Sequence, residues 1–228
     1  MKLSLRMETV KNTVVPCKTL CDVGCDHGFV SIALVEDGTA EKVIACDINK
    51  GPLAAASDNI KAAGLSDSIE TRLSDGLHKV TKEDRPDAIV IAGMGGALTV
   101  KILTEGREVL KTVSQLVLQP QSELFLVRKW LRNEGYNISK ECFLYDMGKP
   151  YFVIDARPGE PTPHTDEENA FFDEFSEYLI KDKNPLYREY LKKGIENNET
   201  YLKGMPAEKR GELIKKTELM RKALLMTE

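Results

Sequence analysis

Glycine-rich turns and nearby carboxylates are the residues of this 228-residue chain whose types and spacing could do chemistry. The first turn is Asp22-Val23-Gly24-Cys25-Asp26-His27-Gly28, which lies between a short apolar run and an amphipathic one. Glycine allows a sharp backbone turn and leaves room for a ligand. The helix that follows offers free N–H groups to a polar or negative ligand. The turn therefore predicts a nucleotide-binding site of the strand–turn–helix kind.

Asp22 indicates which nucleotide such a site would bind. A carboxylate before the glycines would repel the pyrophosphate of a dinucleotide, whereas it suits the cationic amino-acid end of S-adenosyl-L-methionine. Asp26 stands in the middle of the turn, where a methyltransferase loop usually has glycine. The residues of the turn that we expect to bind this cofactor are Asp22, Gly24, Cys25 and Gly28.

Further acidic residues follow the next two apolar runs. Asp47 lies about 20 residues after the glycine turn, the offset at which a carboxylate accepts hydrogen bonds from ribose hydroxyls. Its charge also weighs against a 2′-phosphorylated cofactor. Asp75 follows the third run, where the adenine amino group is usually held, although Asp-Gly also makes ordinary turns. The predicted cofactor site therefore includes Asp47, Ile48, Asn49, Asp75 and Gly76.

A second glycine-rich turn follows the near-continuous apolar run at 87–92, which is typical of a central strand buried on both faces. Two such turns at neighbouring strands mark the switch point where open α/β sheets bind ligands. In this turn we expect contacts to the cofactor from Ala92, Gly93, Met94 and Gly95, and to the acceptor from Gly96. The later turn Gln119-Pro120-Gln121 offers amide groups that can read a base edge without adding charge.

Hydrophobic periodicity predicts the elements that position these turns. We expect strands at 19–23, 42–46, 69–73, 87–92 and 115–118, and helices at 4–14, 28–36, 53–63, 97–110 and 122–134. A hairpin of 136–145 and 151–156, joined by 147–150, then closes the sheet. This order is typical of an α/β protein with a Rossmann-like, seven-stranded class I methyltransferase sheet whose last strand is antiparallel, rather than of a dehydrogenase. Trp130 is expected in the core.

The stretch at 158–165, rich in proline, is the predicted linker between two domains. Residues 1–157 would form the cofactor-binding domain, and 166–228 a small all-α domain with helices at about 166–181, 185–203 and 206–226. Acidic residues slightly outnumber basic ones after residue 160, yet lysines and arginines gather in the last two helices. They form either a solvated helix face or a basic stripe that steers an RNA phosphate backbone.

Composition bounds the class of protein. A hydrophobic content of 42% and a charged content of 30% are those of an ordinary soluble globular protein. No apolar run approaches the roughly 18 residues of a membrane span, and we expect no secretory signal. The net charge of −4 argues against a strongly basic nucleic-acid coat but does not exclude an RNA enzyme, because local patches set the field. The five cysteines form no C-x-x-C pair, so we expect no metal and free thiols in a reducing cytoplasm.

Together these motifs resemble those of the bacterial tRNA adenine-N1-methyltransferases that act on adenosine 22 in the D arm. The resemblance spans essentially the whole chain and rests on Asp22-Val-Gly-Cys-Asp-His-Gly, Leu-Ser-Asp75-Gly-Leu, Ile-Ala-Gly93-Met-Gly-Gly, Leu-Gln-Pro120-Gln and Gly-Lys149-Pro-Tyr. It implies tRNA as the partner, a coiled-coil-like helical hairpin at the carboxyl end, a cytoplasmic location, and a monomer or weak dimer. The chain differs from the family at Cys25, Gly28 and Gln121, where serine or threonine, alanine and asparagine are usual.

Methyl transfer from a sulfonium is an in-line displacement, so catalysis is chiefly the positioning of two partners. Adenine N1 needs no base before it attacks, but the product ring is cationic and a nearby carboxylate would stabilise it. We therefore expect Asp26 to be catalytic, and His27 to be either catalytic or structural. No Asn/Asp-Pro-Pro-aromatic run follows the fourth strand, which argues against methylation of the exocyclic amine. The expected acceptor-binding residues are Arg6, Gly96, Gln119, Pro120, Gln121, Lys149 and Tyr151.

Three functions remain open from the sequence. The first is an RNA methyltransferase acting on adenine N1. The second is a small-molecule methyltransferase whose helical segment acts as a lid. The third is a non-catalytic module that binds S-adenosylmethionine and RNA, and a nicotinamide dehydrogenase fits the pattern least.

Overall fold

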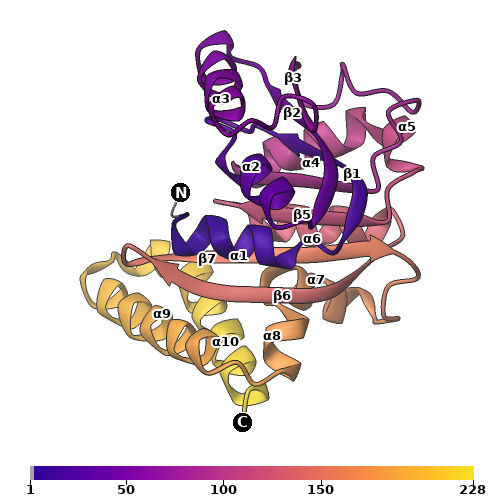
Figure 1. Cartoon of the computed structure of the whole chain (residues 1–228). Helices are drawn as coiled ribbons and strands as arrows, with labels where there is room; N and C mark the ends of the chain where they lie inside the picture. The colour runs from indigo at the N-terminus through magenta and orange to yellow at the C-terminus, as the bar shows by residue number, and fades with distance from the viewer. Residues whose placement is uncertain (1–2) are drawn as a thin grey trace. The chain divides into compact units, whose positions relative to one another are not determined.

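A seven-stranded sheet with helices on both faces makes up most of the computed structural model, which describes residues 3–228 (Figure 1). The strands lie in the order β3-β2-β1-β4-β5-β7-β6. Neighbours from β3 to β5 are parallel, whereas β7 runs antiparallel to both β5 and β6. Their bounds are β1 (Cys17–Val23), β2 (Ala40–Asp47), β3 (Ile69–Leu73), β4 (Ala88–Met94), β5 (Gln115–Pro120), β6 (Tyr136–Asp146) and β7 (Lys149–Pro158). The predicted fold class is confirmed.

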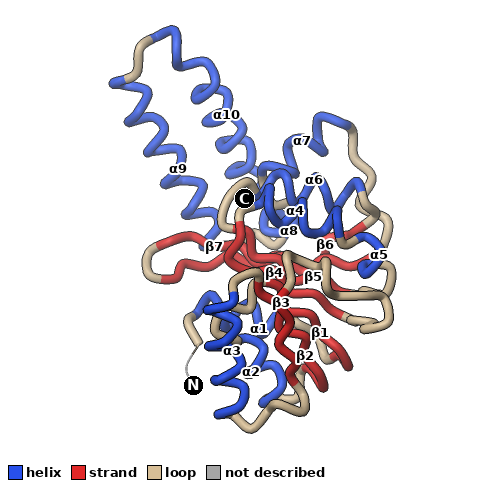
Figure 2. Tube along the Cα trace, turned by 90° about the horizontal axis from the view of Figure 1, so that it is seen from above, coloured by secondary structure: helices blue, strands red, loops and turns tan. Residues whose placement is uncertain are grey.

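The central strands are apolar throughout because helices cover both faces of the sheet (Figure 2). One face is covered by α1 (Leu5–Thr13), α2 (Phe29–Glu36) and α3 (Lys50–Ala62), and the other by α4 (Gly96–Glu105), α5 (Arg107–Leu110) and α6 (Leu124–Asn133). Successive side chains of a strand point to opposite faces. In β4, Val90 therefore joins the core under α1 to α3, and Ile89 and Ile91 join the core under α4 to α6. Trp130 of α6 belongs to the second core, as predicted.

Several element boundaries in the first part of the chain differ from the sequence-based prediction. The helix expected at 97–110 is interrupted at Gly106, where a side chain would collide with Leu77. Gln119 and Pro120 were expected in a turn but belong to β5, where Pro120 pairs with Met94 at the strand end and its missing N–H is tolerated. The hairpin turn is shorter than expected, because Lys149 already pairs with Asp146 in the β-ladder.

The chain divides into two compact units, the first ending at Thr162 and the second beginning at Pro163, within the stretch predicted as a linker. The helices of the second unit are α7 (Asp166–Glu174), α8 (Glu177–Lys181), α9 (Pro185–Gly204), the short 3-10 helix η1 (Ala207–Lys209) and α10 (Arg210–Met226). The single helix expected at 166–181 is two, because the Ser176 hydroxyl accepts a hydrogen bond from the Leu179 N–H and starts α8. Within residues 3–228, none of the helices has the length and apolar character needed to cross a membrane.

Candidate active site

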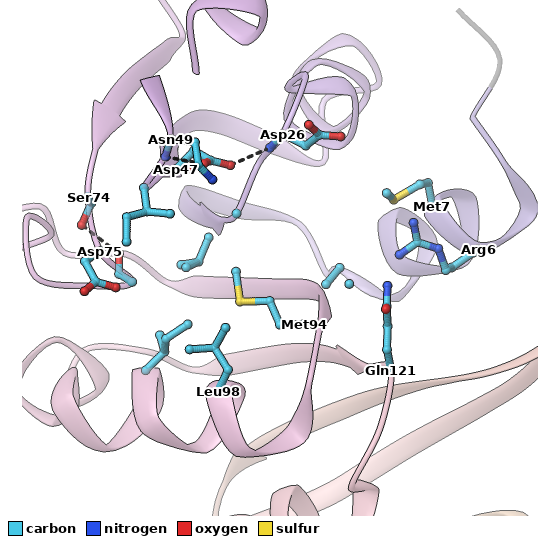
Figure 3. Close-up of a pocket in the computed structure, with 17 residues that line it drawn as sticks. Arg6, Met7, Asp26, Asp47, Asn49, Ser74, Asp75, Met94, Leu98 and Gln121 are labelled. Carbon is cyan, nitrogen blue, oxygen red and sulfur yellow. Dashed lines mark hydrogen bonds between the residues drawn. The ribbon is translucent and has the colours of Figure 1, made fainter. Parts of the chain in front are cut away.

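A cavity of about 500 Å³ lies at the carboxyl ends of β1, β2 and β4, at the switch point of the sheet (Figure 3). Its volume is within the range of small-molecule sites. Both glycine turns reach it, so residues far apart in the sequence meet on one wall. The predicted site residues that line it are Arg6, Gly24, Asp26, Asp47, Ile48, Asn49, Asp75, Gly76, Ala92, Gly93, Met94 and Gln121.

Gly24 lets the first and second glycine turns approach each other. Its φ of +75° lies in the left-handed region, which side chains disfavour. A Cβ at this position would also collide with the side chain of Met94. The left-handed backbone at residue 24 therefore favours glycine, and a larger residue there would also displace the terminal methyl group of Met94.

Asp47 connects the ends of β1 and β2. Its side chain is buried, with one carboxylate oxygen accepting the Asn49 N–H at 2.8 Å and the other the Asp26 N–H at 3.3 Å. Each carboxylate oxygen can accept more than one hydrogen bond. The carboxylate thus holds the first turn in place and keeps acceptor capacity on the side of the cavity.

Asp26 has a left-handed backbone conformation, which glycine adopts more readily than aspartate. Its φ is +51°, which a glycine would adopt without strain, yet the chain has a carboxylate here that is 63% exposed. The His27 Nε2 lies 3.7 Å from Asp26 Oδ1, and the imidazole stacks on Phe29 with ring centroids 5.6 Å apart. Asp26 lines the cavity and His27 does not.

Asp22 lies beneath the first turn rather than on the cavity wall. It is buried and accepts a hydrogen bond from the Ser31 hydroxyl at 2.6 Å. Burial, together with the nearby charge of Asp47, raises the pKa of Asp22 to about 6. Cys25, Gly28 and Gly95 likewise do not line the cavity, and the cofactor contacts assigned to these residues stay predictions.

Arg6 lines the cavity, and three contacts fix it. Its Nη1 donates to the Gln119 side-chain oxygen at 2.6 Å, and its guanidinium lies 5.4 Å from the centre of the Tyr151 ring. Its backbone N–H donates to Asp146 at 3.1 Å. Gln119 is fully buried, so its contact with the cavity runs through Arg6. Gln121, tied to β4 by its N–H bond to the Met94 carbonyl, lines the cavity opposite Asp47 (Figure 3).

The remaining acceptor candidates do not line the cavity: Gly96, Pro120, Lys149 and Tyr151. Conversely, the sequence reasoning missed five lining residues: Met7, Val23, Ser74, Leu98 and Ile102. Leu98 and Ile102 are one helical turn apart on α4, just after the second glycine turn, and that spacing could have found them. With the exposed side chain of Ile48, they give the cavity an apolar surface suited to a flat ring.

Known proteins share this architecture. Residues 3–154 match the family model of a methyltransferase domain. The chain is 34% identical to the tRNA (adenine(22)-N(1))-methyltransferase of Bacillus subtilis, over 82% of this chain and 79% of that protein.

Two solved structures cover nearly the whole chain. Sp1610 of Streptococcus pneumoniae, assigned as a tRNA (m1A22) methyltransferase, has 33% identity and a TM-score of 0.90, covering 98% of this chain and 100% of that one. TrmK of M. capricolum in complex with S-adenosyl-homocysteine has 28% identity and a TM-score of 0.89, with 100% of each chain covered.

Proposed function

This chain belongs to the family of tRNA (adenine-22-N1)-methyltransferases, and we propose that it transfers a methyl group from S-adenosylmethionine to N1 of adenine 22 in tRNA. The observation that carries the proposal is the cavity in which the two glycine turns and Asp47 face Arg6 and Gln121. A substrate of this kind favours a cytoplasmic location. We also propose a monomer or weak dimer as the working form.

The residues present fit the cofactor. Asp47 has acceptor capacity for ribose hydroxyls, and Asp75, which also lines the cavity, would accept a hydrogen bond from the adenine amino group. The apolar side chains of Ile48, Leu98 and Ile102 can contact the adenine ring. When bound, S-adenosylmethionine supplies an electrophilic methyl group on its sulfonium.

The opposite wall would hold the acceptor base. A Cβ built on Gly93 would lie 3.4 Å from Arg6 Nη1 and 3.5 Å from Gln121 Nε2, so two donors converge above a bare stretch of backbone. Such donors orient a base through its edge or bind its phosphate without blocking N1. Asp26 stands between the two walls, where its carboxylate would offset the positive charge that develops on the adenine ring.

Nucleoside analysis tests the proposal. The chain is incubated with tritiated S-adenosylmethionine and unmodified tRNA, and the label is expected in 1-methyladenosine. A tRNA with guanine in place of adenine 22 is expected to take up no label. Equal labelling of that guanine would contradict the assignment of the base, and labelling of small metabolites but never of RNA would favour the small-molecule alternative.

A further inference from the structure

The turn between β6 and β7 contains Met147, an unusual residue for such a turn that does not line the cavity. Met147 and Gly148 have φ of +48° and +77°, the pattern of a two-residue type I′ hairpin. Such positions favour asparagine, aspartate and glycine, whereas methionine opposes a positive φ. Met147 is nevertheless 95% exposed, more than any other large apolar side chain of residues 3–228. Backbone strain and an exposed apolar side chain both cost stability, and residues with such strain cluster at functional sites.

This turn lies at the same end of the sheet as the cavity, the end at which the parallel strands finish. Because β7 runs antiparallel to β5, β7 begins at the end of the sheet where β5 finishes (Figure 1). Asp146, the residue before the turn, accepts the backbone N–H of Arg6, whose side chain lines the cavity. The same side chain lies over Tyr151, two residues after Lys149. Asp146 and Tyr151, which lie before and after Met147 in the sequence, thus connect the turn to Arg6, on the side of the cavity that we propose holds the acceptor base.

The chemistry of adenine N1 requires the base to leave its stack. N1 is on the edge that pairs with the opposite strand, so in a folded RNA arm it is unavailable until the nucleotide swings out. Proteins that unstack nucleic acid often insert an apolar side chain between base steps, methionine among them.

We propose that Met147 is such a wedge. It enters the RNA stack next to the target adenosine and fills the space that the base leaves on entering the cavity. The inference rests on the proposed function. Lys149, which is exposed and forms no ion pair with any residue in the described part of the chain, lies beside the turn and can neutralise a phosphate of the same strand.

Two substitutions distinguish a wedge role of Met147 from a role in the folding of the hairpin. Met147→Asn removes the apolar side chain and suits the type I′ turn, so the hairpin is expected to fold at least as well. Met147→Leu keeps the apolar bulk. We expect Met147→Asn to lower kcat/KM for folded tRNA about tenfold, and Met147→Leu to stay within about twofold of the wild type. Binding of S-adenosylmethionine, measured by calorimetry, is expected to be unchanged in both.

The substrate supplies the second comparison. When the nucleotide that faces the target adenine is replaced so that no pair forms, extrusion is easier, and the defect of Met147→Asn is expected to shrink to about twofold. With 2-aminopurine in place of the target adenine, fluorescence should rise on binding to the wild type and to Met147→Leu, and rise far less with Met147→Asn.

Two results would overturn the wedge while leaving the proposed function intact. One is Met147→Asn matching the wild type on folded tRNA. The other is an equal loss of rate on paired and unpaired substrates. A wild-type chain that leaves adenine 22 unmethylated would instead overturn the proposed function, and the wedge with it.

Discussion

Asp26 has an unfavourable backbone conformation and an exposed carboxylate on the cavity wall. Asparagine tolerates the left-handed region but has no charge. Asp26→Asn is therefore expected to lower the single-turnover rate of methylation about 100-fold, while the dissociation constant for S-adenosylmethionine changes less than about threefold. Asp26→Gly is the matched control for the backbone, since it relaxes the turn and should be equally slow. A wild-type rate in either variant would exclude a catalytic carboxylate.

Asp22 is expected to make stability depend on pH. Because burial raises its pKa from 3.8 to about 6, the folded chain binds more protons than the unfolded chain between these values. Its contribution to the free energy of unfolding therefore falls as pH rises through that window, by about 3 kcal/mol in total. An asparagine in place of Asp22 would lack this loss but keep an oxygen for the Ser31 hydroxyl.

We therefore expect the difference in unfolding free energy between Asp22→Asn and the wild type to grow in favour of the variant from about pH 4 to pH 6, and then to level off. Urea unfolding of both proteins at several pH values measures it. A difference that stays constant over this range would show that the carboxyl titrates normally in the folded chain.

Local spacing was enough to predict part of the site. The glycine turns and Asp47 could be predicted because each follows its own apolar run, and parallel strands bring their ends together. The hydrogen bond from Arg6 to Gln119 could not, since it joins residues 113 positions apart and depends on how α1 crosses the sheet. Met7 lines the cavity for the same reason.

Gly96 lets the start of α4 approach the backbone just before α6. It begins α4, and a Cβ there would lie 2.7 Å from the Ser122 carbonyl oxygen and collide with that of Glu123. Both atoms are backbone, so they cannot rotate away. Gly96→Ala is expected to lower the free energy of unfolding by about 1–3 kcal/mol.

The control is Gly51→Ala in α3, where nothing lies within 4 Å of an added Cβ. Alanine favours a helix over glycine, so this variant is expected to gain about 0.5–1 kcal/mol or to remain unchanged. Urea unfolding measures both variants. Equal stabilities for Gly96→Ala and Gly51→Ala would mean that the loop at Ser122 yields easily.

The type and order of the elements were predictable from the sequence, whereas several ends were not. Apolar runs determine which segments are strands because burial drives them into the sheet. Gln119 and Pro120 carry turn-like residue types, yet β5 extends through them because β4 pairs alongside, across a bulge between Ala92 and Met94. Tertiary pairing thus decides where a strand ends, and residue type alone does not contain that information.

The whole molecule has a net charge of −4, so any grip on RNA must come from local cations. In the second unit, α9, η1 and α10 carry exposed lysines that form no ion pair with the described residues, among them Lys203, Lys209, Lys215 and Lys216. Replacing all four with glutamine is expected to weaken tRNA binding and to lower the slope of log affinity against log salt by up to about 3. Fluorescence anisotropy at several salt concentrations measures the slope.

The matched control replaces four lysines that already have carboxylate partners within 2.8 Å: Lys11, Lys111, Lys181 and Lys192. These cations are partly neutralised, so the salt slope should change less. Binding of S-adenosylmethionine should be intact in both variants, because every cavity residue belongs to the first unit. Equal slopes in the two variants would place the RNA surface elsewhere.

The five cysteines of the chain are all free thiols, and Cys21, Cys25 and Cys46 are buried. Burial raises the pKa of the Cys25 thiol, and only the thiolate reacts readily with alkylating agents. Cys25 is part of the first glycine turn, so its alkylation requires that turn to open. The rate at which an iodoacetamide adduct forms on Cys25, followed by peptide mass spectrometry, therefore measures how often the turn opens and how far bound S-adenosylmethionine slows the opening, with no substitution introduced into the protein.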